Sequence, residues 1–167
     1  MFKKILLAVV FALPLSALAQ KFGTVDLEAI FTAMPEAAAM QTQISDTSKK
    51  YEEEFLKLQE ELNKLYADFQ NIQNDANTPE SIKERRIQEI QERAQKVDQF
   101  RQTAQEDVSR LQQSLMAPIQ AKMQDAVKAV GAEGSFTFIF PNEEGLILYS
   151  GTDVVDVTPL VRAKLGI

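Results

Sequence analysis

The chain has 167 residues, a formal net charge of −6, and no histidine, cysteine or tryptophan. Without histidine or cysteine, the common catalytic triads, thiol nucleophiles and zinc sites lack the residues that form them. The acidic balance argues against nucleic acid as a partner, because nucleic-acid binding depends on clustered Lys and Arg that neutralise phosphates. The composition therefore favours a binding or structural role, in a chain long enough for one domain.

Residues 1–19 have the three regions of an export signal. Two lysines precede an apolar run over 5–13, and small residues stand at Ala17 and Ala19, the positions that a signal peptidase reads. We expect cleavage after Ala19, which removes the two lysines and moves the net charge from −6 to −8. A retained amphipathic anchor is the alternative. No later segment reaches the roughly 20 apolar residues of a membrane helix, so we expect an exported, soluble chain without stable membrane insertion.

Two short elements and a long helix follow the expected cleavage site. Residues 21–25 carry β-forming side chains and predict a strand, and Asp26 is a plausible N-cap for a brief helix through Phe31. Pro35 is a favourable residue for the first turn of the next helix, which we expect to continue to about Asn74.

Apolar residues in this long helix recur in steps of four and three. Such a heptad rhythm predicts a helix with one narrow apolar stripe, which is too thin for a globular core and suited to packing on a second helix. Ser48 is the only polar residue in the rhythm. The stripe comprises Met40, Ile44, Tyr51, Phe55, Leu58, Leu62, Leu65, Phe69 and Ile72.

A second heptad helix follows a short polar turn. Turn formers occupy about 74–79, and Thr78-Pro79 predicts the start of a helix that runs to about Val130. Two heptad helices joined by a short turn predict an antiparallel hairpin. The stripe of the second helix reads Ile87, Ile90, Ala94, Val97, Arg101, Ala104, Val108, Leu111, Leu115, Ile119, Met123, Val127 and Val130.

The last third of the sequence changes to a period of two. Residues 135–140 predict a strand with three phenylalanines on one face, and residues 146–150 predict a returning strand after a turn. Thr158 and the proline after it predict the start of a final amphipathic helix, which ends at Gly166.

We therefore predict an α+β fold with an inserted arm. Residues 20–35 and 131–167 would form a small β-rich body, and 36–130 a helical hairpin arm with its tip at about 74–79. A body of about fifty residues rarely makes a self-sufficient core without disulfides, so we expect it to be an oligomerisation body. The expected subunit-contact residues are Phe22, Val25, Phe136, Phe138, Phe140, Leu146 and Leu148.

The sequence offers no pattern typical of an active site. Its six glycines are scattered, so no phosphate-binding loop is present, and its carboxylates fall on faces expected to be solvated. We therefore predict no enzymatic activity, no catalytic residues, no metal and no cofactor.

The two ends of the mature chain resemble a known family. "KFGTVDLEAIF" at 21–31 and "YSGTDVVDVTPLVRAKL" at 149–165 resemble the ends of the Skp (OmpH) family of periplasmic chaperones. The export signal and the inserted hairpin match as well, so the resemblance covers essentially the whole mature chain. It implies a homotrimer whose helical arms surround a cavity, where unfolded outer-membrane proteins are held without ATP on their way to the outer membrane.

One departure from the family concerns charge. The best-studied members are strongly basic and this chain is acidic, so lipopolysaccharide or anionic-lipid binding is not carried over from the family.

Apolar residues that stand off the two stripes are the candidates for contact with clients. They are Leu56, Tyr66, Phe100 and Met116. The alternative for these residues is local padding of the arm or body. The alternative for the whole chain is a coiled-coil spacer or adaptor of the cell envelope, which would have a smooth charged arm and one folded partner.

Overall fold

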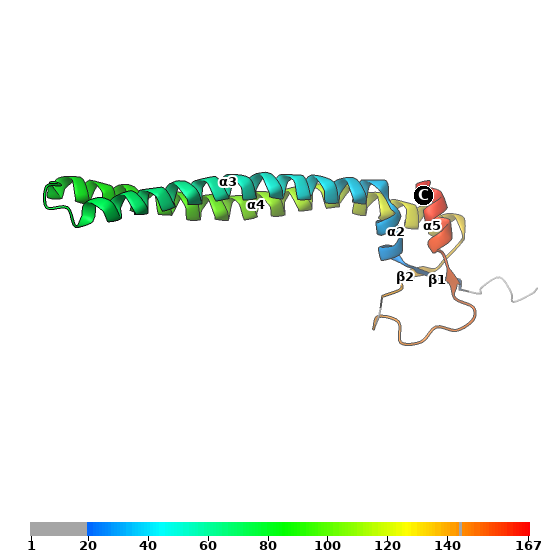
Figure 1. Cartoon of the computed structure of the whole chain (residues 1–167). Helices are drawn as coiled ribbons and strands as arrows, with labels where there is room; N and C mark the ends of the chain where they lie inside the picture. The colour runs from blue at the N-terminus through cyan, green and yellow to red at the C-terminus, as the bar shows by residue number, and fades with distance from the viewer. Residues whose placement is uncertain (1–19, 144) are drawn as a thin grey trace, which may run out of the picture. The chain divides into compact units, whose positions relative to one another are not determined.

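The computed structural model describes residues 20–143 and 145–167, and the expected export signal lies outside the described residues (Figure 1). The chain divides into two compact units, one formed by the segment up to Ala33 with Ala121–Ile167, the other by Met34–Gln120. The elements in chain order are β1 (Phe22–Val25), α2 (Leu27–Ala33), α3 (Pro35–Gln73), α4 (Glu80–Glu133), β2 (Phe138–Pro141), β3 (Val155–Asp156) and α5 (Thr158–Leu165).

The unit Met34–Gln120 contains α3 and most of α4, which lie side by side (Figure 1). Contacts along the pair connect Tyr51 with Asp107 and, nearer the tip, Glu61 with Arg93. Residue numbers thus rise along α3 as those of their partners fall along α4.

The turn between these helices is organised by one carboxylate. Asp75 Oδ1 accepts from the Asn77 backbone N–H at 3.0 Å, and Oδ2 accepts from the Thr78 hydroxyl at 2.8 Å. The Asn77 N–H and the Thr78 hydroxyl hold the pKa of Asp75 below its ordinary value. The sequence predicted a tip at this place, and α3 ends at Gln73 while α4 begins at Glu80.

The heptad stripe of α3 is half-buried where it faces α4. From Tyr51 to Ile72 every member of the predicted stripe is half-buried, whereas the residues between them are exposed. The position of the stripe in α3 was therefore predicted correctly.

The stripe of α4 differs from the prediction near Arg101. Arg101 is exposed, and its neighbour Phe100 is half-buried instead. Nearer the tip, Ile87 is 41% exposed while Arg86 is half-buried. The ring of Phe100, and not the guanidinium of Arg101, therefore packs on the partner helix.

The other unit contains a three-stranded sheet in the order β2-β1-β3, with both pairings parallel. Phe22 pairs with Phe138, and Thr24 pairs with Phe140 on one side and Asp156 on the other. The strands have four, four and two residues, so the predicted β-rich body has a small sheet accompanied by helices.

The predicted strand at 146–150 is wrong. These residues carry no strand, and the second partner of β1 is β3 at Val155–Asp156. Local β propensity misled the prediction, because pairing with β1 is decided by contacts distant in sequence.

The core of this unit lies on one side of the sheet. Val25 is 2% exposed, and Ile30, Val157 and Val161 are fully buried. Further buried residues of the unit are Met123, Ala126 and Val130. The last turns of α4 thus belong with the sheet, together with α2 and α5.

Candidate functional surfaces

A row of phenylalanines lies open on one face of the sheet. The rings of Phe22 and Phe138 stack with centroids 6.3 Å apart, and those of Phe138 and Phe140 with centroids 5.8 Å apart. Phe22 and Phe138 are register partners, and Phe140 follows two residues later, so the three rings share a face. Phe138 is 57% exposed and Phe140 44% exposed. The unit therefore leaves the rings of Phe138 and Phe140 substantially exposed.

Two of the predicted subunit-contact residues pack within their own chain in the structure. Val25 is buried in the core of the unit. Phe136 is half-buried before β2 begins, with the Lys21 ammonium 4.1 Å from its ring centroid. Its ring packs so closely on Gly23 and Gly134 that a Cβ at either position would crowd it. The sequence placed Phe136 on the same strand face as Phe138, and this prediction is wrong because the strand starts two residues later.

The segment after β2 adds exposed apolar residues to this unit. Leu146 is 56% exposed and Leu148 is 93% exposed. Tyr149, which was not among the predicted subunit-contact residues, is 87% exposed. The signal that could have identified Tyr149 is its place directly beside the "LIL" run in a segment without secondary structure.

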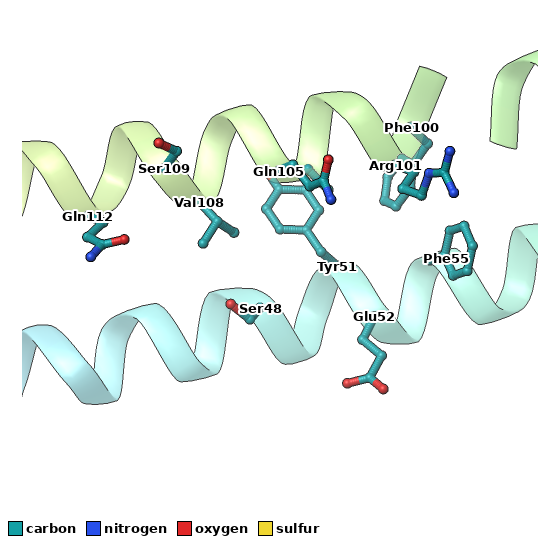
Figure 2. A pocket seen from close by; sticks show the side chains of 11 residues that line it. Ser48, Tyr51, Glu52, Phe55, Phe100, Arg101, Gln105, Val108, Ser109 and Gln112 are labelled. Atoms are coloured by element: carbon teal, nitrogen blue, oxygen red, sulfur yellow. The ribbon is translucent and has the colours of Figure 1, made fainter. Parts of the chain in front are cut away.

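The arm has a shallow groove of about 420 Å³ between α3 and α4 (Figure 2). Tyr51 reaches from α3 toward α4, where its ring meets Phe100 edge-on with centroids 5.9 Å apart (Figure 2). Small residues at Ser48 and Ala104 leave the adjoining space unfilled. The remaining lining residues are Glu52, Phe55, Arg101, Gln105, Val108, Ser109 and Gln112.

Tyr51 also makes a hydrogen bond from α3 to α4. The Tyr51 hydroxyl donates to Asp107 Oδ2 at 2.8 Å. This bond to a carboxylate, together with desolvation, raises the pKa of the Tyr51 phenol above its ordinary value. The phenol therefore remains a neutral donor at physiological pH.

The four candidate client-binding residues lie in different surroundings. Leu56 is 55% exposed and Tyr66 is 44% exposed, as expected for residues available to a partner. Met116 is half-buried and lines a second hollow of about 460 Å³ along α4. Phe100 is half-buried against Tyr51, so most of its ring supports the helix pair and is not free for a client.

The described part of the chain contains no cluster of three or more acidic residues arranged for a metal ion. Among the described residues, no helix has the length and hydropathy needed to cross a membrane.

Comparison with known proteins places the chain in a family. No curated protein matches the sequence significantly. The family model described as outer membrane protein (OmpH-like) matches residues 21–165, nearly the whole chain. The matched region includes both units of the structure, from β1 to α5. The chain therefore belongs to the OmpH-like family.

Proposed function

We propose that the chain is a periplasmic holdase that binds unfolded outer-membrane proteins without ATP and prevents their aggregation. The observation that carries this proposal is the family match over residues 21–165. The OmpH-like family is periplasmic and is associated with chaperones of outer-membrane proteins. Residues 1–19 would direct export and then be removed.

The form of the arm supports this role. An unfolded barrel protein exposes strands with alternating apolar and polar residues, and unprotected strands pair edge to edge. An antiparallel hairpin offers a long surface with shallow hollows and exposed apolar residues such as Leu56 and Tyr66. Burying one such side chain contributes at most about 1.5–3 kcal/mol, so several weak contacts must act together.

Trimerisation would supply these multiple contacts. The exposed side chains of Phe138, Phe140, Leu146 and Leu148 are apolar groups that association would remove from water. Three arms joined through these residues would bind one client with an avidity above that of a single arm.

An aggregation assay tests the proposed function. A urea-unfolded outer-membrane barrel protein is diluted into buffer with and without the mature chain, and light scattering is followed. We expect an equimolar amount of trimer to suppress the scattering. A chain that leaves aggregation unchanged would contradict the holdase proposal and favour the spacer, which has a folded partner.

A further inference from the structure

The two flanks of the α3 stripe differ sharply in charge. Here a flank is the set of residues directly before, or directly after, the stripe members. The residues before Tyr51 to Phe69 are all charged: Lys50, Glu54, Lys57, Glu61, Lys64 and Asp68. The residues after them contain one charge: Glu52, Leu56, Gln59, Asn63, Tyr66 and Gln70. All twelve residues are exposed, so burial does not explain the difference.

The predicted α4 stripe shows the same asymmetry over a longer distance, although in the structure Phe100 is half-buried in place of Arg101. The residues before Ile87 to Ile119 include six charges: Arg86, Glu89, Arg93, Lys96, Asp107 and Arg110. The residues after them include a single acid and seven glutamines: Gln88, Gln91, Gln95, Asp98, Gln102, Gln105, Ser109, Gln112, Met116 and Gln120. We call the preceding sets the charged flanks and the following sets the neutral flanks.

The structure brings the two charged flanks to one side of the arm. Arg93 Nη1 of α4 lies 3.1 Å from Glu61 Oε2 of α3, and both residues belong to charged flanks. Lys57 and Glu54 form a pair within one charged flank at 3.5 Å, whereas Arg101 of the stripe pairs at 3.6 Å with Asp98, the one acid of the α4 neutral flank. The pairs Arg86–Glu89 and Arg110–Asp107 also lie within one charged flank.

The two neutral flanks meet on the other side. The groove in Figure 2 is lined by Gln105, Ser109 and Gln112 of the α4 neutral flank and by two charged residues, Glu52 of the α3 neutral flank and Arg101 of the predicted stripe. The second hollow continues along the same flank to Met116 and Gln120. Both hollows of the arm thus have neutral-flank residues in their walls.

We propose, resting on the proposed function, that unfolded polypeptide binds to the neutral side of the arm while the charged side stays in water. An extended chain presents neutral backbone N–H and C=O groups that must be satisfied. Side chains of Gln and Asn offer both donors and acceptors to such a backbone. Desolvating ionised groups costs free energy. A polypeptide that covers the side with few charges therefore has the smaller desolvation penalty.

The apolar candidates agree with this assignment. Leu56, Tyr66 and Met116 all belong to the neutral flanks. Phe100, which is half-buried in place of Arg101, is the candidate that packs on Tyr51 within the arm. The neutral side therefore combines amides for a client's backbone with separate apolar residues for its side chains. This combination matches segments in which apolar and polar residues alternate.

Site-specific photocross-linking tests the assignment directly. The chain has no cysteine, so one introduced cysteine carries a benzophenone label at a single known position. Labels at Gln59, Gln91 and Gln102 report on the neutral side, and labels at the nearby exposed positions Lys57, Glu89 and Thr103 report on the charged side. With a urea-unfolded barrel protein as the probe, we expect about tenfold more cross-linked client from the neutral side.

A matched pair of triple variants measures the contribution to affinity. Gln59→Glu, Gln91→Glu and Gln102→Glu together place three charges on the neutral side. Asn71→Asp, Thr103→Glu and Ser114→Glu place three charges at exposed positions on the charged side. We expect the first variant to weaken client binding about tenfold and the second to change it less than about twofold. Lysine at the three glutamine positions should weaken binding as well, because the cost lies in desolvation.

The outcomes distinguish this inference from the function on which it rests. Equal cross-linking from both sides, or equal losses in the two triple variants, would overturn the assignment while leaving the holdase intact. Cross-links between arms without any client would assign the neutral side to a second copy of the chain and overturn it too. Failure of the unlabelled chain in the aggregation assay would instead remove the proposed function, and this inference with it.

Discussion

The backbone N–H of Asp26 donates to the hydroxyl of Thr158 over 2.9 Å, across 132 positions of sequence. Asp26 also caps α2, because its Oδ1 accepts from the Ala29 N–H at 2.8 Å. The sequence suggested that Thr158 caps its own helix. In the structure the Thr158 hydroxyl accepts from Asp26 instead, and Asp156 Oδ1 accepts from the Thr158 N–H at 2.9 Å at the start of α5. One side chain thus joins the two ends of the matched family region.

Removing this hydroxyl should destabilise the unit that contains the sheet. We expect Thr158→Val to lower the free energy of unfolding by about 1–3 kcal/mol, because the Asp26 N–H loses its partner in a partly buried place. Thr158→Ser keeps the hydroxyl and should lose less. Urea unfolding at one fixed protein concentration measures both, since association affects apparent stability. Equal stability of the valine variant and the native chain would contradict the prediction.

A methyl group at Gly134 should be poorly tolerated. A Cβ there would lie 2.5 Å from Phe136 Cε2, so the ring has to move. We expect Gly134→Ala to cost about 1–3 kcal/mol of stability through this overpacking, measured as a lower thermal midpoint. Gly151→Ala is the matched control, because nothing lies within 4 Å of its Cβ position. Similar midpoints for the two variants would show that the Phe136 ring moves aside without loss of stability, which would contradict the prediction.

Stability at alkaline pH should depend on Tyr51. Because its pKa is raised in the folded chain, the folded state keeps the phenol proton to higher pH than the unfolded state. The stabilisation is fully present below the ordinary value of 10.0 and is lost as pH rises through the raised value. Thermal unfolding of the native chain and of Tyr51→Phe from neutral to alkaline pH measures this difference. The native midpoint should fall more steeply above pH 10.0, and parallel curves would contradict the prediction.

The open phenylalanines should control the oligomeric state. We expect Phe138→Ser with Phe140→Ser to lower the mass from light scattering roughly threefold, from a trimer to a monomer, with most helicity retained. Phe136→Ser is the contrasting variant, because that ring packs within its own chain. It should lower stability more than it lowers mass. An unchanged mass in the double variant would remove these two rings from the subunit contact.

Local periodicity was enough to place the stripe of α3 but not the whole stripe of α4. Along α3 the steps of four and three continue without a break from Tyr51 to Ile72, so the buried face is defined by the sequence. At Phe100 and Arg101 two neighbouring residues compete for the same position. The choice depends on the ring of Tyr51 across the pair, which is not visible in the sequence of α4 alone.

The sheet was predicted only in part from the sequence. The strands at β1 and β2 were predicted from their own residues, while β3 has only two residues and carries no periodic signal. The burial of Val25 and Phe136 also follows from which face of the sheet the helices cover. Those facts depend on contacts between segments far apart in the chain, and no local pattern encodes them.

The central place of β1 in the sheet has a consequence for how the molecule forms. β1 leaves any export channel first, yet both of its neighbours belong to the last part of the chain to emerge. Closing so long a loop is entropically slow, whereas two helices joined by a six-residue turn can meet early. Early pairing of α3 with α4 would bring β2 and β3 close to β1, with which they pair. The arm would then serve the chain's own assembly before it serves any other protein.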